Sequence, residues 1–535
     1  MYYHQALARA MADQGITDVF GVLGDANLYF MEAWERAGGH YVAAAHEGAG
    51  VLAATGYAST ADKVGVATVT HGPALTNALT ALVDATRARM PVLLIAGDTD
   101  PQVRGHLQSI DQHSVVQVSG AGWEPATTPQ NVATDLARAL RRAEAESRPV
   151  VLNIPITFQW TDVDYVPAPS ASVRHRRTRP DQDALEEATG ILAAARRPVV
   201  LGGRGARHSR EALVALAERL GAPMATSLRG KGLFSGHRHD LGICGTLSHA
   251  TALATMDRAD CVVAFGAALN DFTTAEGSLL RGKRVIHVDT DPARPDLWSS
   301  ADVGVVGDAG AVADALVELL DEIEHSPTGF ADDDLALALK APRPALRTTH
   351  TGGLDVVAVL RRIDEAFPAD RTLVVDDGRF ILTAYAELGA PHPSAYVHTC
   401  SFASIGLGLG NAIGAYAGAP GRPVLAVVGD GGFMSAGLNE LNTAVRAGTD
   451  LVLVMVNDRA YGAEHVQLVH KGLDPAISTF DWPDFAPVAE SLGAHGITVR
   501  SLEDLDAALS RVAERDRPVL IDVQVDPYDV PGSFL

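Results

Sequence analysis

Short, uninterrupted apolar runs alternate with longer segments of helical periodicity along most of the chain. The apolar runs occupy residues 64–70, 91–97, 198–203, 261–266, 284–289, 372–378, 424–430, 451–458 and 518–525. Such runs are typical of strands buried on both faces, and helices between them indicate parallel sheets. The pattern therefore predicts an α/β protein with doubly wound parallel sheets.

Two stretches interrupt this alternation and predict the domain boundaries. Residues 165–181 contain three prolines, small residues and the basic sequence RHRRTR, and residues 324–353 are a second irregular stretch. Clusters of proline and small polar residues mark linkers, so we expect RHRRTR to be solvated rather than a binding patch. Three α/β domains are predicted, at 1–165, 181–325 and 350–535.

Composition and charge narrow the class of protein. The chain has 535 residues, of which 47% are hydrophobic and 20% charged, as in soluble globular proteins. Its formal net charge of −22 argues against binding to nucleic acid or to anionic membranes. The first residues lack the basic start and apolar run of a signal peptide, and no apolar run is long enough to span a membrane. We expect a cytoplasmic protein, with Cys244, Cys261 and Cys400 as reduced structural thiols.

The strongest chemical signal lies in residues 427–462. An apolar strand ends at Gly429, Asp430, Gly431 and Gly432, a helix follows, and a second strand ends at Asn457 and Asp458. In a right-handed βαβ unit both strands end at the same edge of the sheet. Carboxylates next to a glycine-rich turn and a helix N-terminus are suited to Mg²⁺ and a diphosphate.

This segment resembles the thiamine diphosphate motif, in which GDG is followed by an asparagine or an Asn-Asn pair. Around FMSAG it is one residue longer than usual, and Asp458 replaces the second asparagine. The resemblance implies that the Mg²⁺ ligands are Asp430, Asp458 and the carbonyl of Ala460, while the choice between Asn457 and Asp458 stays open. It also implies that Gly429, Gly431, Gly432, Tyr461 and Gly462 contact the cofactor.

The resemblance extends to segments far from this motif. In YVAAAHEGAG, residues 41–50, it implies that Glu47 hydrogen-bonds N1′ of the coenzyme's aminopyrimidine, with small neighbours leaving room for the ring. In SFASIGLGLGNAIGA, residues 401–415, it implies that Ile405 wedges between the coenzyme's rings and that the Ala403 carbonyl accepts a hydrogen bond. Gly378 would contact the far side of the diphosphate. Residues 1–165 would then bind the pyrimidine and residues 350–535 the diphosphate.

The chain resembles acetohydroxyacid synthases, benzoylformate decarboxylases and pyruvate oxidases. We expect decarboxylation of a 2-oxo acid with C–C bond formation, as in acetolactate synthases. A simple 2-oxo acid decarboxylase and a 2-hydroxyacyl-CoA lyase are the alternatives. The candidate proton-handling residues are His71, Gln108 and His113, followed by Glu464 and His465. His71 stands where serine is usual, and residues 107–116 contain His113 but no histidine pair like that of pyruvate decarboxylases.

Two other classes of protein stay open. Residues 199–209, VVLGGRGARHS, resemble a dinucleotide-binding loop but lack its third glycine, so an FAD- or NAD-dependent oxidoreductase is weakly supported and bound FAD is not expected. A non-catalytic paralogue is the other class. The resemblance further implies a homodimer or homotetramer, in which Glu47 and the metal motif of one site come from different subunits.

Overall fold

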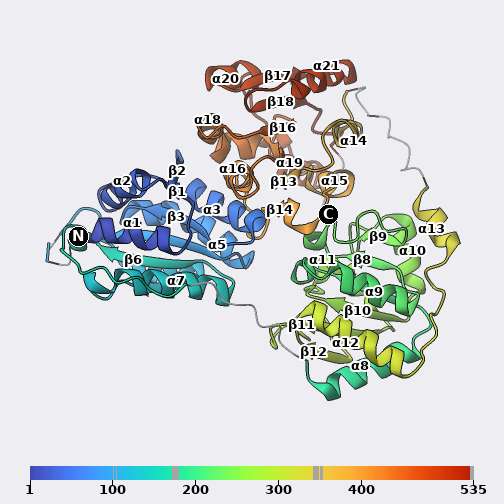
Figure 1. The fold of residues 1–535 in the computed structure, drawn as a ribbon. Helices are drawn as coiled ribbons and strands as arrows, with labels where there is room; N and C mark the ends of the chain where they lie inside the picture. Colours follow the sequence, from blue (N-terminus) through green and yellow to red (C-terminus); the bar gives the residue numbers. More distant parts are fainter. Residues whose placement is uncertain (101, 104, 171–179, 342–348, 350–352, 531–535) are drawn as a thin grey trace. The chain divides into compact units, whose positions relative to one another are not determined.

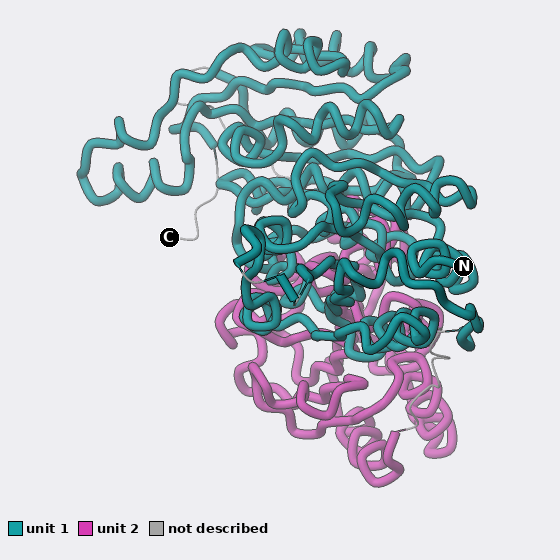
Figure 2. Tube along the Cα trace, turned by 90° about the vertical axis from the view of Figure 1, so that its left-hand side faces the viewer, with its two compact units in different colours: residues 1–174, 346–388, 397–535 teal, residues 175–345, 389–396 magenta. Residues whose placement is uncertain are grey.

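The computed structural model describes residues 1–100, 102–103, 105–170, 180–341, 349 and 353–530 (Figure 1). The basic sequence RHRRTR, residues 174–179, lies outside these residues, as does part of the second irregular stretch. The chain forms two compact units (Figure 2). The first unit contains residues 1–174, 346–388 and 397–535, and the second contains residues 175–345 and 389–396.

The first unit contains two six-stranded sheets. One has the strand order β2-β1-β3-β4-β6-β5 and the other β14-β13-β15-β16-β18-β17. The first sheet comprises β1 (Asp18–Gly21), β2 (His40–Ala43), β3 (Gly65–Val69), β4 (Val92–Asp98), β5 (Gly122–Pro125) and β6 (Val150–Pro155). The second comprises β13 (Thr372–Val375), β14 (Tyr396–His398), β15 (Val424–Gly429), β16 (Leu451–Asn457), β17 (His495–Val499) and β18 (Val519–Gln524).

Helices cover the faces of these sheets (Figure 1). Next to the first sheet are α1 (Tyr3–Asp13), α2 (Leu28–Arg36), α3 (Glu47–Ala61), α4 (Pro73–Asn77), α5 (Leu79–Arg87), α6 (Gln112–Ser119) and α7 (Val132–Glu146). Next to the second are α14 (Val356–Ala366), α15 (Ile381–Glu387), α16 (Gly408–Gly418), α17 (Asp430–Gly432), α18 (Leu438–Arg446), α19 (Gly462–His470), α20 (Phe485–Ser491) and α21 (Leu502–Ala513). Apolar side chains of α1, α2 and α7 share one core with the first sheet. A second core joins both sheets through α3 and α16.

Helices α3 and α16 pack with their backbones in close contact. A Cβ atom at Gly56 would lie 2.0 Å from the carbonyl oxygen of Asn411, and one at Gly414 would lie 1.7 Å from that of Ala53. Any side chain at these positions would push the helices apart. The small residues that follow Glu47 therefore serve this helix–helix contact, in addition to any role beside a ring.

The second unit has a six-stranded sheet of order β12-β11-β10-β7-β8-β9. Its strands are β7 (Pro198–Gly202), β8 (Met224–Thr226), β9 (Asp240–Ile243), β10 (Cys261–Phe265), β11 (Arg284–Asp289) and β12 (Val303–Val306). Helices α8 (Gln182–Ala194), α9 (Arg210–Leu220) and α12 (Ala309–Glu322) share one core with it, and α10 (Ala250–Arg258) shares a core on the other face. The glycines of the dinucleotide-like loop pack closely: a Cβ at Gly203 would lie 2.2 Å from the carbonyl oxygen of Gly266.

The three sheets with flanking helices confirm the predicted fold class, and every predicted apolar run overlaps a strand. Most of the strands that were not predicted are short or lie at a sheet edge, such as β1, β2 and β17, but β6 has six residues and lies between β4 and β5. The second irregular stretch differs from the prediction, because it contains the helix α13 (Asp333–Leu339), whose first turn the Asp332 carboxylate caps. Another short helix, α11 (Asp271–Thr274), lies between β10 and β11. In the described part of the chain, every helix is too short or too polar to cross a membrane.

Candidate active site

The ends of β15 and β16 bring the two parts of the glycine-rich motif to one sheet edge. The strands pair in parallel, with Gly429 opposite Val456. Asp430 follows β15 and begins α17, whereas Asp458 follows the last residue of β16. The spacing of 28 residues thus becomes spatial proximity, because parallel strands end at the same edge.

Asp430 is a buried acid without full hydrogen bonding. Its side chain is 2% exposed, and its Oδ2 atom makes no hydrogen bond with any described residue. Burial, and next to it the charge of Asp458, raises its pKa to about 7. A buried carboxylate oxygen without a partner is costly, and a bound cation would remove that cost.

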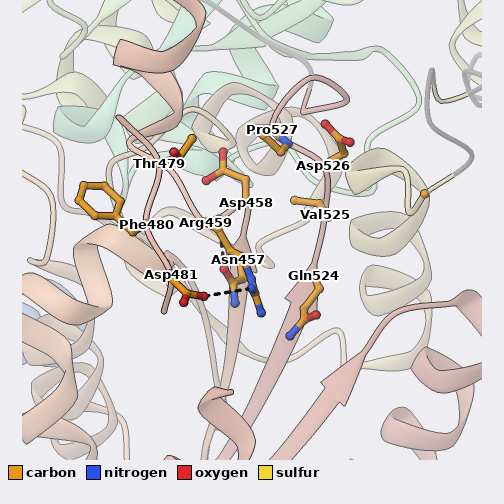
Figure 3. A pocket seen from close by; sticks show the side chains of 11 residues that line it. Asn457, Asp458, Arg459, Thr479, Phe480, Asp481, Gln524, Val525, Asp526 and Pro527 are labelled. Atoms are coloured by element: carbon orange, nitrogen blue, oxygen red, sulfur yellow. Dashed lines mark hydrogen bonds and ion pairs between the residues drawn. The ribbon is translucent and has the colours of Figure 1, made fainter. Parts of the chain in front are cut away.

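Asn457 and Asp458 leave the end of β16 in different directions (Figure 3). Asn457 is buried, and its amide donates a hydrogen bond of 2.8 Å to the Asp522 carboxylate. The Asp458 carboxylate accepts a 3.1 Å hydrogen bond from the backbone N–H of Ala460. Burial raises the pKa of Asp458 to about 6. Asp458 is therefore better placed than Asn457 to offer a carboxylate to a metal.

The additional residue of the motif is accommodated by a π-helix. Residues Phe433–Gly437, with the sequence FMSAG, form this turn between α17 and α18. A π-helical turn takes up one extra residue without breaking the helix, and such turns are frequent at functional sites. The insertion therefore leaves Asp430 at the start of the helical segment.

A loop from residue 403 to 407 lies beside this turn and is held by a buried acid. Asp376, which follows β13, accepts hydrogen bonds from the backbone N–H groups of Gly406 (3.0 Å) and Leu407 (3.1 Å). Burial raises its pKa to about 7. Ala403 has a φ of 53°, a conformation uncommon outside glycine, and Ile405 is only partly buried. Asp376 was not predicted from the sequence, although an acid pair before Gly378 was the available signal.

Glu47 begins α3 and is half-buried. Its carboxylate accepts a hydrogen bond of 3.0 Å from the amide of Asn77, at the end of α4. The preceding turn is held by α18: both oxygens of Glu440 accept from the N–H of Ala45, at 3.1 and 3.2 Å, and Arg446 donates to the carbonyl of Ala43 at 2.8 Å. Glu440 is fully buried and was not predicted from the sequence.

The candidate proton-handling residues lie in different environments. His71 is 2% exposed and follows β3, and the carbonyl of Gln108 lies close to the adjacent Gly72. His113, by contrast, is exposed on α6 with its ring 5.3 Å from that of Trp123. His465 is buried on α19, where its Nδ1 lies 3.1 Å from the Ser478 hydroxyl, and the neighbouring Glu464 is exposed.

A cavity of about 880 Å³ opens beside Asp458 at the ends of β16 and β18 (Figure 3). It is lined by Asp458, Arg459, Thr479, Phe480, Gln524 and Asp526, among others. Tyr461 and Gly462 follow directly, and a Cβ at Gly431 would lie 2.8 Å from the Tyr461 ring. The described residues contain no group of three or more His, Cys, Asp or Glu side chains arranged around a metal. A cation held by Asp430 and Asp458 would therefore need carbonyl, phosphate or water oxygens as further ligands.

Comparisons with known proteins agree with the cofactor site inferred from the glycine-rich turn and the buried acids. Residues 1–115 match the N-terminal TPP-binding domain of thiamine pyrophosphate enzymes, residues 185–316 match their central domain, and residues 378–523 match their C-terminal TPP-binding domain. The chain belongs to the family of thiamine pyrophosphate-dependent enzymes. The resemblance inferred from the sequence is confirmed.

The relatives span nearly the whole chain. A probable 2-ketoarginine decarboxylase of Pseudomonas aeruginosa is 32% identical over 94% of this chain and 89% of its own length. The large subunit of acetolactate synthase isozyme 3 of Escherichia coli is 28% identical over 98% and 94%, respectively. A sulfoacetaldehyde acetyltransferase of Alcaligenes xylosoxydans is 27% identical over 95% and 90%. The relatives thus include a decarboxylase, a synthase and an acetyltransferase.

Proposed function

We propose that this enzyme decarboxylates a 2-oxo acid with thiamine diphosphate and Mg²⁺. The nucleophilic fragment that remains after loss of CO₂ is then joined to a carbonyl acceptor. The observation that carries the proposal is the pair of buried acids, Asp430 and Asp458, beside a glycine turn, with one Asp430 oxygen lacking a hydrogen bond. Simple decarboxylation, in which a proton replaces the acceptor, is the alternative, and lysis of a 2-hydroxyacyl-CoA is a further one.

The residues present fit the cofactor. Asp430 and Asp458 would hold Mg²⁺ with the carbonyl of Ala460, while Gly429, Gly431 and Gly432 would leave backbone N–H groups free for the diphosphate. Tyr461 and Gly462 continue this wall of the site. The side chain of Asn457 is engaged by Asp522, which supports Asp458 as the ligand.

Other residues would orient and activate the cofactor's rings. Gly378 would contact the diphosphate, Ile405 would pack between the rings, and the Ala403 carbonyl would accept from the amino group. Glu47 would share a proton with N1′ of the aminopyrimidine. When bound, thiamine diphosphate supplies the carbon nucleophile and the electron sink that decarboxylation needs.

A second candidate reaction is decarboxylation of a cationic 2-oxo acid. The 32% identity with a probable 2-ketoarginine decarboxylase favours it. Acidic groups beside the proposed metal ligands would suit a guanidinium, since Asp481 and Asp526 line the cavity together with the basic residue Arg459. A panel of 2-oxo acids with neutral, acidic and guanidinium side chains separates these candidates.

The proposed division of labour follows the three predicted domains. Residues 1–165 would bind the pyrimidine and residues 350–535 the diphosphate, with 181–325 as a structural middle domain. We propose a homodimer or homotetramer in which Glu47 serves the metal motif of a partner subunit. The enzyme is proposed to be cytoplasmic and to act on small molecules.

The direct test is calorimetric titration of the protein with thiamine diphosphate in the presence of Mg²⁺, followed by the 2-oxo acid panel. We expect saturable heat, release of CO₂ from at least one acid, and a product whose mass distinguishes an aldehyde from a ligated product. Absence of binding heat would refute the proposal.

Two variants sharpen this test. Glu47→Gln keeps the shape of the side chain but loses the shared proton, so we expect coenzyme binding to persist while turnover falls at least about 100-fold. Asp430→Ala removes a metal ligand, so coenzyme binding itself should be lost. Hydrogen–deuterium exchange at C2 of the bound coenzyme reports the Glu47 effect without any substrate, and unchanged exchange in Glu47→Gln would contradict the role of Glu47.

A further inference from the structure

Several polar side chains gather around His71 at the carboxyl edge of the first sheet. His71 lies two residues after β3, and Asp98 is the last residue of β4, with Val69 opposite Ala96 in the parallel pairing. Asp25 follows β1, the other neighbour of β3. A ligand site of an α/β sheet lies at this edge.

His106 contacts His71 from the loop that follows β4. The two ring centroids are 5.5 Å apart, with an interplanar angle of 48°. The backbone N–H of Gln108 donates a 3.2 Å hydrogen bond to Nδ1 of His106. Since Nδ1 accepts, the neutral His106 ring carries its proton on Nε2. The ring is partly exposed, so it can exchange this proton with solvent.

A buried amide network holds the turn that carries His71. Gln112 accepts from the N–H of Gly72 and donates to the Gly97 carbonyl and to Asn153, each at 2.8 Å. Asn153 in turn donates to the Asp98 carboxylate at 2.8 Å. A fully bonded buried network of this kind fixes one geometry. The ring of His71 is therefore presented by a rigid turn.

The same turn is connected to Glu47. Helix α4, of five residues, starts two residues after His71 and ends at Asn77, which donates to the Glu47 carboxylate. Five helical residues span about 8 Å. The two histidines and the proposed activating acid thus lie along one edge of one sheet.

We propose that His71 and His106 form a single proton-handling pair, in which His71 meets the substrate and His106 is a positioning residue that acts through His71. The inference rests on the function proposed above. Loss of CO₂ leaves an electron pair on the former carbonyl carbon. One proton is then needed, on the oxygen of a carbonyl acceptor if the two are joined, or on that carbon if an aldehyde is released. His71 would deliver that proton and recover one from solvent through His106.

Charge in the cluster favours one proton on the pair rather than two. The pKa of His71 is lowered by burial and then by His106, whereas Asp25 and Asp98 act in the opposite direction. These are the charged groups that face His71 from the loop after β1, from β4 and from the loop that follows it. His113, on α6, packs on Trp123 instead.

The test is a pH titration of histidine side chains by NMR in the cofactor-free protein, with ¹³C-labelled histidine. His106→Gln removes a like charge, so we expect the pKa of His71 to rise. Asp25→Asn removes an opposite charge and should lower that pKa. His113→Gln is the matched control, because it removes an exposed histidine outside the cluster, and it should leave the His71 titration unchanged.

The holoenzyme supplies the second readout. Because His71 must be protonated to deliver its proton, the alkaline limb of kcat in His106→Gln should move to higher pH together with the pKa of His71, while KM changes little. A His71 titration that is the same in His106→Gln and His113→Gln would overturn the pairing. Normal kcat in His71→Gln would overturn the proton-handling role. Absence of turnover on every 2-oxo acid would refute the proposed function, and the titration of the cofactor-free protein separates that failure from failure of the pair.

Discussion

At the scale of residues, the site depends on acids held where water cannot fully solvate them. Asp430 and Asp458 are 2% and 7% exposed, and the charge of Asp458 raises the cost of ionising Asp430. In the cofactor-free protein the positive charge of Arg379 acts in the opposite direction on Asp458. A bound divalent cation changes this balance, because its positive charge makes the state with two ionised carboxylates the favourable one.

This predicts a definite pH dependence of Mg²⁺ binding. The metal requires ionised carboxylates, whose pKa values in the metal-free protein are about 7 for Asp430 and about 6 for Asp458. Below these values protons compete with the metal, so affinity should rise from pH 5 to pH 8 and level off above, with proton release on binding. Calorimetry in buffers of different ionisation enthalpy measures both quantities.

The variant Asp458→Asn tests the coupling between the two acids. It removes one ligand charge, so Mg²⁺ affinity should fall about tenfold or more. It also removes the charge that raises the pKa of Asp430, so the remaining pH dependence should shift to lower pH. Asp481→Asn, at an exposed acid of the same cavity, is the control. Affinity that is independent of pH in the unmodified protein would contradict this account.

At the scale of elements, helix α18 connects the proposed metal motif to the turn that carries Glu47. It follows the π-helix directly, and Glu440 and Arg446 bind backbone groups of residues 43–45. A buried carboxylate that accepts backbone N–H groups at the start of a helix adds a favourable interaction with the helix dipole. Glu440 should therefore stabilise the conformation of the turn rather than take part in chemistry.

Replacing Glu440 tests this role. Glu440→Ala leaves the N–H of Ala45 unpaired, a cost of about 1–3 kcal/mol. Amide hydrogen exchange in residues 43–48 of the cofactor-free protein should accelerate about tenfold or more, with little change in α7. Glu440→Gln retains one acceptor oxygen and should lie between the two. Exchange in residues 43–48 that is equal in Glu440→Ala and the unmodified protein would contradict the role.

At the scale of the whole molecule, the question is which chains complete one active site. The first compact unit already contains both cofactor-binding halves of the chain, packed through α3 and α16. Membership of the family leads us to expect that Glu47 nevertheless serves a partner's metal motif. An isologous dimer would then contain two such sites, because each chain contributes both halves.

Mixing two inactive variants separates shared sites from sites within one chain. In a heterodimer of Glu47→Gln and Asp430→Ala, one of the two shared sites combines an intact Glu47 with an intact Asp430. With random exchange half of the dimers are of this type, so activity should return to about a quarter of the unmodified level. Sites contained within one chain would give no recovery. Each variant alone, taken through the same exchange, is the control.

The sequence by itself determined the α/β class, the strands with long apolar runs and the spacing between Asp430 and Asp458. These depend on local periodicity and turn residues, which act within a few tens of positions. It did not determine β1, β2 or β17, which are short or lie at a sheet edge and therefore lack a long apolar run.

Only the tertiary structure decided which side chains meet. Asn457 turns to Asp522, 65 positions away, and Glu440 bonds to Ala45 across 395 positions. His106 contacts His71, and the turn that carries His71 is held by the buried Gln112. No pattern in the sequence indicates such pairs, because their contact is set by the packing of separate elements rather than by neighbouring residues.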